Sequence, residues 1–357
     1  MSKNSAAQVL SKENLAPFLR SLRVPIAAPV AMENGDVLFQ KGVAPEEAAP
    51  EYVNSIISPV KFAFPQTQVL LRYRLGKEPM VEAHFEVGPM VIFGLRSCDV
   101  TAFRYLNQFF SRPPVDTPFV EAMQNLLLIS LTCQEPGPNC FCVCCHAGPF
   151  LEEGYDLQLT DFGDKYLVEI GSEKGEQAVE GHAEFFSPAP DELLSQRQEL
   201  ALEAQQKFTI SAHFGTGIRK LTTRRLSEEV WELLAARCVE CGGCAYVCPL
   251  CTCFDVVDRA ETPASGLRER TWDCCQYAGY SLEASGHNPR ETKVSRFKRR
   301  FYHKLSYFYL EQDGRHGCVG CGRCVQTCFG EVDMPLVVNA LREETAQPVY
   351  GRGGAGR

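Results

Sequence analysis

The sequence lacks any long hydrophobic segment. Its longest apolar runs, around Val91–Leu95 and Leu126–Leu131, have the length of a strand, whereas a helix that crosses a bilayer needs about 20 apolar residues. The first residues contain no apolar core of the kind that a secretory signal requires. We therefore expect no membrane span and no export, and we predict a cytoplasmic protein.

Positive charge is also scarce. The 357 residues include 36 Lys and Arg against 44 Asp and Glu, a net charge of −8. Because binding to nucleic-acid phosphates needs a positive surplus, we expect no nucleic-acid partner. A dinucleotide-binding site is not expected either. The C-terminal GRGGAG matches the letters of the glycine fingerprint G-x-G-x-x-G, but it has no predicted strand before it and no predicted helix after it.

Cysteine, by contrast, is abundant, with 18 residues. Disulfides rarely persist in a reducing compartment, so thiols in tight groups point to bound metal. No cysteine lies between Cys145 and Cys238. This gap predicts two separate cysteine-bearing modules.

The pattern of apolar residues predicts an α/β fold for the first module. Val91–Leu95 and Leu126–Leu131 have the composition of buried strands, and Asn34–Gly35 is a hairpin turn signal. Cys98 and Cys133 each come just past one of these strands. Open α/β sheets bind their ligands at that edge, so both thiols are candidate ligands.

The domain organisation follows from these signals. We expect helices after the proline-rich residues 187–190 and after Ser227, which is a candidate N-cap. The second module is predicted to be an α+β, ferredoxin-like domain that holds two clusters. The predicted parts are an α/β N-terminal domain (1–186), a linker helix region (187–226), the two-cluster domain (227–345) with a helical insert (254–317), and a disordered tail (346–357).

Two cysteine motifs share one spacing. Residues 238–249 read C-x₂-C-x₂-C-x₃-C-P, and residues 318–328 repeat the four cysteines. This spacing is typical of two-cluster ferredoxins, in which the fourth cysteine ligates the other cluster. We expect the fourth cysteine at the start of a helix and the glycines where the loop closely approaches inorganic sulfide. The predicted ligands are Cys238, Cys241, Cys244 and Cys328 for one [4Fe–4S] cluster, and Cys318, Cys321, Cys324 and Cys248 for the other.

A pair of zinc sites is the alternative interpretation of these motifs. Zinc prefers two well-separated C-x₂-C knuckles, and four cysteines within 11 residues, twice, fit that preference poorly. Two features depart from a small ferredoxin. Residues 249–317 are too long for a minimal connector, and Phe329 stands where proline normally follows the fourth cysteine.

Several blocks resemble a known family. Residues 272–308, with WDCCQ and GHNPR, and residues 93–103, FGLRSCDVTAF, resemble the dicluster ferredoxin subunits of cytoplasmic sulfhydrogenases (the beta subunit) and of anaerobic sulfite reductases (the iron–sulfur subunit). The matching blocks extend over much of residues 60–340. The resemblance implies an electron-transfer subunit that links a flavin-containing, NAD(P)H-reactive subunit to a terminal reductase, hydrogenase or heterodisulfide-reductase-like module. It implies no catalytic residue in this chain.

The resemblance also includes N-terminal cysteines. It implies that four thiolates at one sheet edge hold a third [4Fe–4S] cluster, while a zinc site or plain buried thiols stay open. These four are Cys98, Cys133, Cys140 and Cys142. Six further cysteines have no assigned role: Cys144, Cys145, Cys251, Cys253, Cys274 and Cys275. The adjacent pair among them keeps open a second hypothesis, a catalytic iron–sulfur protein that acts on disulfides or sulfur compounds.

The segment from Arg290 to Lys304 is strongly basic, with seven Lys or Arg in 15 residues. Three interpretations stay open. The segment could be a solvated face, it could compensate the charge of anionic clusters, or it could be a docking face for an acidic partner.

Overall fold

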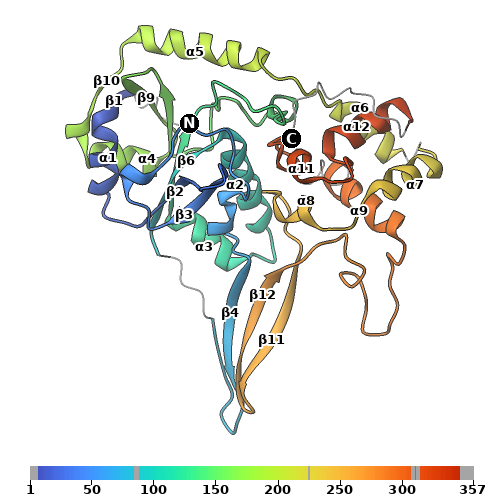
Figure 1. Cartoon of the computed structure of the whole chain (residues 1–357). Helices are drawn as coiled ribbons and strands as arrows, with labels where there is room; N and C mark the ends of the chain where they lie inside the picture. Colours follow the sequence, from blue (N-terminus) through green and yellow to red (C-terminus); the bar gives the residue numbers. More distant parts are fainter. Residues whose placement is uncertain (1–6, 84–87, 224–225, 307–309, 311–313, 346–357) are drawn as a thin grey trace. The chain divides into compact units, whose positions relative to one another are not determined.

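The computed structural model describes residues 7–83, 88–223, 226–306, 310 and 314–345 (Figure 1). The predicted disordered tail, 346–357, lies outside the described residues. The chain forms two compact units. The first unit comprises 1–65, 85–208 and 319–321, and the second comprises 66–84, 209–318 and 322–357.

An eight-stranded mixed sheet forms the centre of the first unit (Figure 1). Its strand order is β10-β1-β9-β8-β7-β6-β2-β3, and the neighbours from β2 through β6 and β7 to β8 run parallel. The strands are β1 (Gln8–Ser11), β2 (Ile26–Ala31), β3 (Val37–Lys41), β6 (Met90–Leu95), β7 (Leu126–Leu131), β8 (Leu157–Asp161), β9 (Lys165–Ile170) and β10 (Phe186–Pro188).

The two strands predicted to be buried are confirmed. β6 is buried at every residue and β7 at all but one, and they pair in parallel in the middle of the sheet. Strands covered on both faces are expected to be apolar throughout. The hairpin signal is also confirmed, since Asn34 and Gly35 connect the antiparallel strands β2 and β3.

Helices complete the first unit, so a mixed α/β architecture is confirmed. The predicted helix after residue 190 is present as α5. The α-helices are α1 (Lys12–Ser21), α2 (Ser97–Phe110), α3 (Thr117–Asn125), α4 (Glu173–Glu180) and α5 (Asp191–Gln206). The short 3₁₀ turns are η1 (Pro45–Glu47), η2 (Pro59–Phe62), η3 (Cys142–Cys145) and η4 (Ala183–Phe185).

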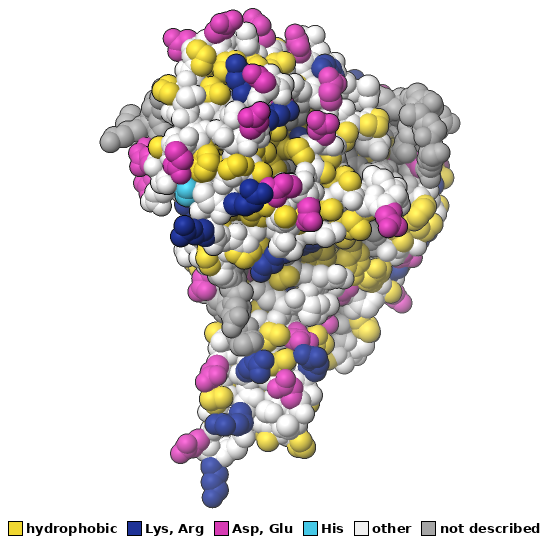
Figure 2. Space-filling view, turned by 60° about the vertical axis from the view of Figure 1, so that its left-hand side comes forward, with side chains coloured by type: hydrophobic (Ala, Val, Ile, Leu, Met, Phe, Trp, Pro, Cys, Tyr) yellow, Lys and Arg dark blue, Asp and Glu magenta, His cyan; other side chains and the backbone are white. Residues whose placement is uncertain are grey.

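The second unit contains an antiparallel sheet of order β11-β12-β4-β5. Its strands are β4 (Thr67–Arg74), β5 (Met80–Ala83), β11 (Phe254–Thr262) and β12 (Ser265–Trp272). The expectation of a helical insert over 254–317 is therefore wrong for its first part, which is a hairpin. β11 is exposed along its whole length, and Figure 2 shows charged and hydrophobic side chains interspersed on this sheet, at the lower end of the view.

The helices of the second unit carry the two cysteine motifs. Ser227 caps α7 as predicted, because its Oγ accepts a hydrogen bond from Val230 N at 3.3 Å. The helices are α6 (Phe214–Thr222), α7 (Glu228–Arg237), α8 (Gly243–Tyr246), α9 (Lys293–Leu305), α11 (Arg323–Thr327) and α12 (Met334–Glu343). Trp231 of α7 packs against Phe297 and Phe301 of α9 and so fixes α9 beside the loop that follows α7.

The main junction between the units falls at residues 208–209. It lies between the boundaries predicted at 186 and 227, which stay predictions of where domains end. Among the described residues, no helix combines the length and the apolar character needed to cross a membrane.

Candidate functional site

The first cysteine motif begins where α7 ends. Cys238 is the C-cap of α7, and the chain then turns through Glu240 (φ 54°) and Gly242 (φ 73°) into α8. A Cβ at Gly242 would lie 2.5 Å from the Oη of Tyr277. The loop therefore needs glycine there for its left-handed backbone and for its close packing.

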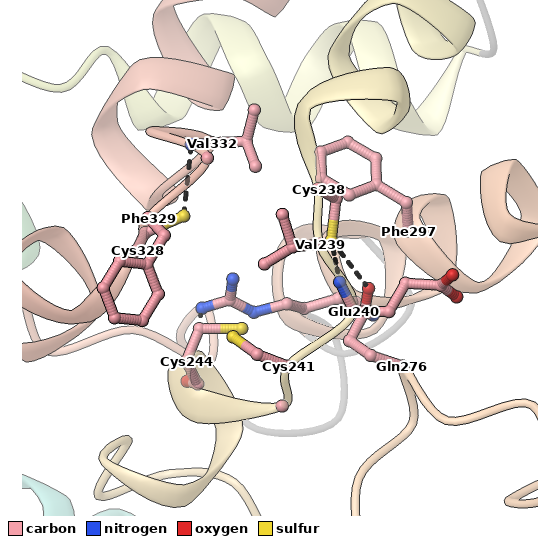
Figure 3. A pocket seen from close by; sticks show the side chains of 13 residues that line it. Cys238, Val239, Glu240, Cys241, Cys244, Gln276, Phe297, Cys328, Phe329 and Val332 are labelled. Carbon is pink, nitrogen blue, oxygen red and sulfur yellow. Dashed lines mark hydrogen bonds between the residues drawn. The ribbon is translucent and has the colours of Figure 1, made fainter.

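The structure brings the first predicted ligand set together. Cys238, Cys241, Cys244 and Cys328 all border one pocket, and their side chains reach it from two segments far apart in the sequence (Figure 3). The spacing rule alone predicted that Cys328 joins the first three cysteines. Their role as ligands stays a prediction, and the geometry is compatible with it.

The fourth cysteine of each motif lies at the end of a short helix, not at its start as predicted. Cys328 is the C-cap of α11, and Cys248 follows the C-cap of α8. The cause is the position of the glycines. Gly242 (φ 73°) and Gly322 (φ 77°) are the N-caps of these helices, so the helix starts before the third cysteine.

Backbone amides donate to two of the sulfurs at the pocket. Glu240 N lies 3.4 Å from the Sγ of Cys238, and Val332 N lies 3.3 Å from the Sγ of Cys328 (Figure 3). Burial nevertheless raises the pKa of Cys244 to about 11. Such a thiol ionises when it coordinates a metal. The two amides would stabilise negative charge on the sulfurs of Cys238 and Cys328.

The basic segment is the main surprise, because part of it is buried. Arg296, Arg300 and Lys304 lie four residues apart on one face of α9 and are 6%, 5% and 7% exposed. Side chains spaced in this way share a helix face. A docking face or a solvated face is therefore wrong for these three. Arg296 pairs with Glu240, and charge compensation is the interpretation that fits Arg300 and Lys304.

Arg300 and Lys304 point toward the cysteines. Lys304 Nζ lies 3.4 Å from the Sγ of Cys248 and donates to Gly317 O at 3.0 Å. Arg300 Nη2 lies 3.5 Å from Cys244 O, and its pKa is raised well above the usual value by the sulfurs near it, although burial opposes this. Both side chains thus favour negative charge on the surrounding sulfurs.

The charge of Arg300 and Lys304 indicates whether a [4Fe–4S] cluster fits the site. Within the described residues, no carboxylate pairs with Arg300 or Lys304, and Arg300 Nε makes no hydrogen bond. Buried charge is costly unless an opposite charge accompanies it. Four thiolates around a cluster would supply that charge, so the residues fit the group.

A single metal ion fits less well. In the described part of the chain, no three Cys, His, Asp or Glu side chains stand close enough to hold one metal ion. Zinc requires thiolates within about 4 Å of one another, given its bond length of about 2.3 Å. A cubane with one thiolate at each of four irons holds its thiolates farther apart, and four cysteines border the pocket.

The second predicted ligand set is divided between the units. Cys248, Cys318 and Cys324 belong to the second unit, whereas residues 319–321, including Cys321, belong to the first. Asn54 Nδ2 donates to Cys321 O at 2.6 Å. The first unit therefore holds this cysteine by direct contact.

The N-terminal cysteines approach Cys321 inside the first unit. Cys133 follows β7, Cys140 lies just before η3, and Cys142 is the first residue of η3. Burial raises the pKa of Cys142 well above its usual value, and the neighbouring sulfurs of Cys133, Cys140 and Cys321 raise it further. Three of the four cysteines predicted for a third cluster thus lie near one another, together with a fourth that the motif assigns elsewhere.

Cys98 lies in the first turn of α2, at the same sheet edge as Cys133, as predicted from the strands. Its neighbour Ser97 lies beside Cys142, because a Cβ at Gly148 would be 2.9 Å from Ser97 Cβ and 3.3 Å from Cys142 Sγ. Cys98 is therefore close in the fold to the other N-terminal cysteines.

Four further cysteines lie around the hairpin of β11 and β12. Asp273 N donates to Cys253 O at 2.9 Å, which continues the ladder and brings Cys253 near Cys275. The thiol of Cys275 raises the pKa of Cys253, and the thiol of Cys251 lowers the pKa of Cys248, so the members of each pair lie close together. The sequence could not predict these pairs, because they depend on the register of the hairpin.

Comparison with known proteins gives a match over the segment that contains both cysteine motifs. Residues 237–332 match the model of the 4Fe-4S dicluster domain family. Over 311 residues the chain is 28% identical to sulfhydrogenase 2 subunit beta of Pyrococcus furiosus, and the match covers 87% of this chain and 90% of the relative. The chain is a homologue of this beta subunit. The resemblance inferred from the sequence blocks is confirmed.

This homology also confirms the general character of the chain. It is an iron–sulfur protein of the electron-transport, oxidoreductase type, with [4Fe–4S] clusters as the expected cofactors. No solved structure matches the chain.

Proposed function

We propose that the chain is an electron-transfer subunit with two [4Fe–4S] clusters. One is held by Cys238, Cys241, Cys244 and Cys328, and the other by Cys318, Cys321, Cys324 and Cys248. The observation that carries the proposal is the pocket at which four cysteines from two distant motifs meet, lined also by the buried Arg300.

When bound, each cluster supplies one-electron redox chemistry. The protein's own residues hold it and set its surroundings. The amides of Glu240 and Val332 donate to sulfur, and Arg300 and Lys304 place buried positive charge beside the thiolates. Net charge and hydrogen bonds to sulfur are what tune a cluster potential.

The partners are proposed from the same evidence. The relative is named as a subunit, which supports a multi-subunit assembly for this chain as well. We infer a flavin-containing, NAD(P)H-reactive subunit on one side and a catalytic reductase or hydrogenase subunit on the other. The sequence predicts no dinucleotide-binding site, which supports this division of labour, and a reducing, cytoplasmic location suits the clusters.

A third [4Fe–4S] cluster in the first unit is part of the proposal. The mutual proximity of Cys133, Cys140 and Cys142 supports it, with Cys98 as the predicted fourth ligand. Cys321 competes for this place, because it lies near Cys142 in the same unit.

A catalytic role toward disulfides is the second candidate. The proximity of Cys253 and Cys275 favours it. However, the pKa of Cys253 is raised, first by its hydrogen bond with Cys275 and then by burial, and the pKa of Cys275 is raised as well. A thiol must ionise to attack a disulfide, so this pair is a poor nucleophile and electron transfer is the better proposal.

The test is the metal content and the electron capacity of anaerobically purified protein. Two filled [4Fe–4S] sites require about eight irons and about eight acid-labile sulfides. The chain should accept electrons from dithionite and pass them to a dye, without oxidising NAD(P)H or reducing sulfite, disulfides or protons. Zinc with little iron would contradict the proposal, and disulfide turnover that disappears in Cys275→Ser would favour the catalytic candidate.

A further inference from the structure

The buried basic face of α9 places different amounts of positive charge beside the two predicted cluster sites. Lys304 contacts the Cys248 sulfur and the carbonyl of Gly317, the residue before Cys318. Both cysteines belong to the second ligand set. Among the described residues no carboxylate pairs with Lys304, so it adds one buried positive charge to that set.

The first ligand set has a balanced environment. Arg296 is the basic residue of α9 nearest to its loop, and its guanidinium pairs with Glu240, between Cys238 and Cys241. The two charges cancel. Lys293 also lies near Cys238, but its bond to Ala236 O is exposed, so solvent screens its charge.

Arg300 serves both sets. The sulfurs of Cys244, Cys324 and Cys248 all raise the pKa of its guanidinium. These cysteines belong to both predicted ligand sets. Arg300 therefore shifts both sites in the same direction. Arg315 adds to the difference, because its Nη2 donates to Cys318 O at 3.3 Å beside the second set. Lys304 is the cation that contacts a sulfur of that set directly.

We propose that Lys304 makes the cluster ligated by Cys248, Cys318, Cys321 and Cys324 the stronger electron acceptor of the two. Internal electron flow then runs from the Cys238 set toward the Cys248 set. This inference rests on the proposed electron-transfer function, and it adds a direction to it.

The physical reason is electrostatic. Accepting an electron makes a cluster one unit more negative, and a nearby cation stabilises that state. Because Lys304 is 7% exposed, water and salt screen this attraction little. The electron comes from the external donor, which is oxidised, and no bond to Lys304 forms or breaks.

A redox titration followed by electron paramagnetic resonance tests the proposal on the full holoprotein. Lys304→Gln keeps a polar side chain but removes the charge, and Lys304→Arg keeps the charge. Lys298→Gln is the matched control, because Lys298 lies on the same helix but pairs with Glu228 near the surface. Iron content is measured on each preparation.

We expect wild type to show two distinct midpoint potentials. Lys304→Gln should lower only the higher one, by about tenfold in reduction equilibrium, which is 59 mV for a one-electron couple. Lys304→Arg and Lys298→Gln should leave it in place. Cys241→Ser, which leaves the second ligand set complete, should retain the higher-potential signal.

Each result has a definite meaning. Loss of iron in Lys304→Gln but not in Lys304→Arg would support the proposal, because charge would then be required for assembly. Loss in both would assign Lys304 a packing role and overturn it, as would an unchanged or raised potential in iron-loaded Lys304→Gln. Wild-type protein without clusters would instead refute the electron-transfer function itself.

Discussion

Arg296 donates from Nε to Oε1 of Glu240 at 3.0 Å and so ties α9 to the loop between Cys238 and Cys241. The same guanidinium also donates to Gln276 O and Arg290 O, each at 3.1 Å. Glu240 has a left-handed backbone, with φ 54°. A single buried side chain thus holds a strained loop, the insert and a helix in one arrangement.

Removing this side chain should loosen the first cluster site. We expect Arg296→Met to lower the free energy of unfolding by about 3 kcal/mol, because it leaves Glu240 and three carbonyls without their partner. We also expect it to lose the iron of one cluster, about four irons. Lys298→Met, which removes a surface ion pair with Glu228, should cost less than about 1 kcal/mol. Chemical unfolding and iron analysis check both, and equal losses would contradict the role of Arg296.

Gly320 should tolerate no side chain. Its φ is 64°, and a Cβ would lie 2.5 Å from both Cys142 Cα and Phe141 O. Gly314 has a similar φ of 69° but nothing within 4 Å. We expect Gly314→Ala to cost about 1 kcal/mol through backbone strain alone, and Gly320→Ala to cost clearly more because backbone must move. The difference between the unfolding midpoints of the two variants measures the effect of close packing at Gly320. Similar midpoints would contradict this effect.

The third cluster should be visible as extra iron. If the N-terminal site is filled, wild type should contain about twelve irons, and Cys133→Ser should lose about four of them. Cys98→Ser should do the same if Cys98 is a ligand. Cys144→Ser is the control because Cys144 lies outside the predicted set. About eight irons in wild type, unchanged in Cys133→Ser, would leave these residues as structural thiols.

His303 should make stability fall in acid. Burial, and then the charges of Lys304, Arg299 and Arg290, lower its pKa from 6.5 to about 4. The folded chain therefore keeps His303 neutral while the unfolded chain takes up a proton below about pH 6.5. The stability contributed by neutral His303 is present above that pH and is lost as pH falls toward 4.

Compared with His303→Gln, wild type should lose about 2 kcal/mol between about pH 7.5 and about pH 5. Both chains carry the same cysteines, so the acid lability of any cluster cancels in the comparison. Parallel pH profiles of the two proteins would contradict the assignment.

The sequence predicted those features that local physics determines. Continuous apolar runs identified β6 and β7, and Ser227 identified the start of α7, because burial and capping act over a few residues. The ligand set that includes Cys328 was predicted from motif chemistry, and the structure brings its members to one pocket.

The sequence did not predict the contacts that depend on tertiary packing. The alternation of Val69, Leu71 and Tyr73 in β4 is a strand signal, but its pairing with β12 joins residues about 200 positions apart in the chain. The burial of Arg296, Arg300 and Lys304 has a signal too, in their spacing of four. Charged residues normally face solvent. The ion pair with Glu240 explains the burial of Arg296, and the surrounding sulfurs explain that of Arg300 and Lys304.

The path of the chain has a practical consequence for genetics. The backbone passes between the two units five times, after residues 65, 84, 208, 318 and 321. A gene fragment that starts at codon 209 would encode the hairpin of β11 and β12 without β4 and β5, and it would leave a β12 edge of eight residues unpaired. Deletions and fusions that preserve the fold must keep residues 66–84 together with the C-terminal half. Neither half can therefore be exchanged between proteins as one uninterrupted segment.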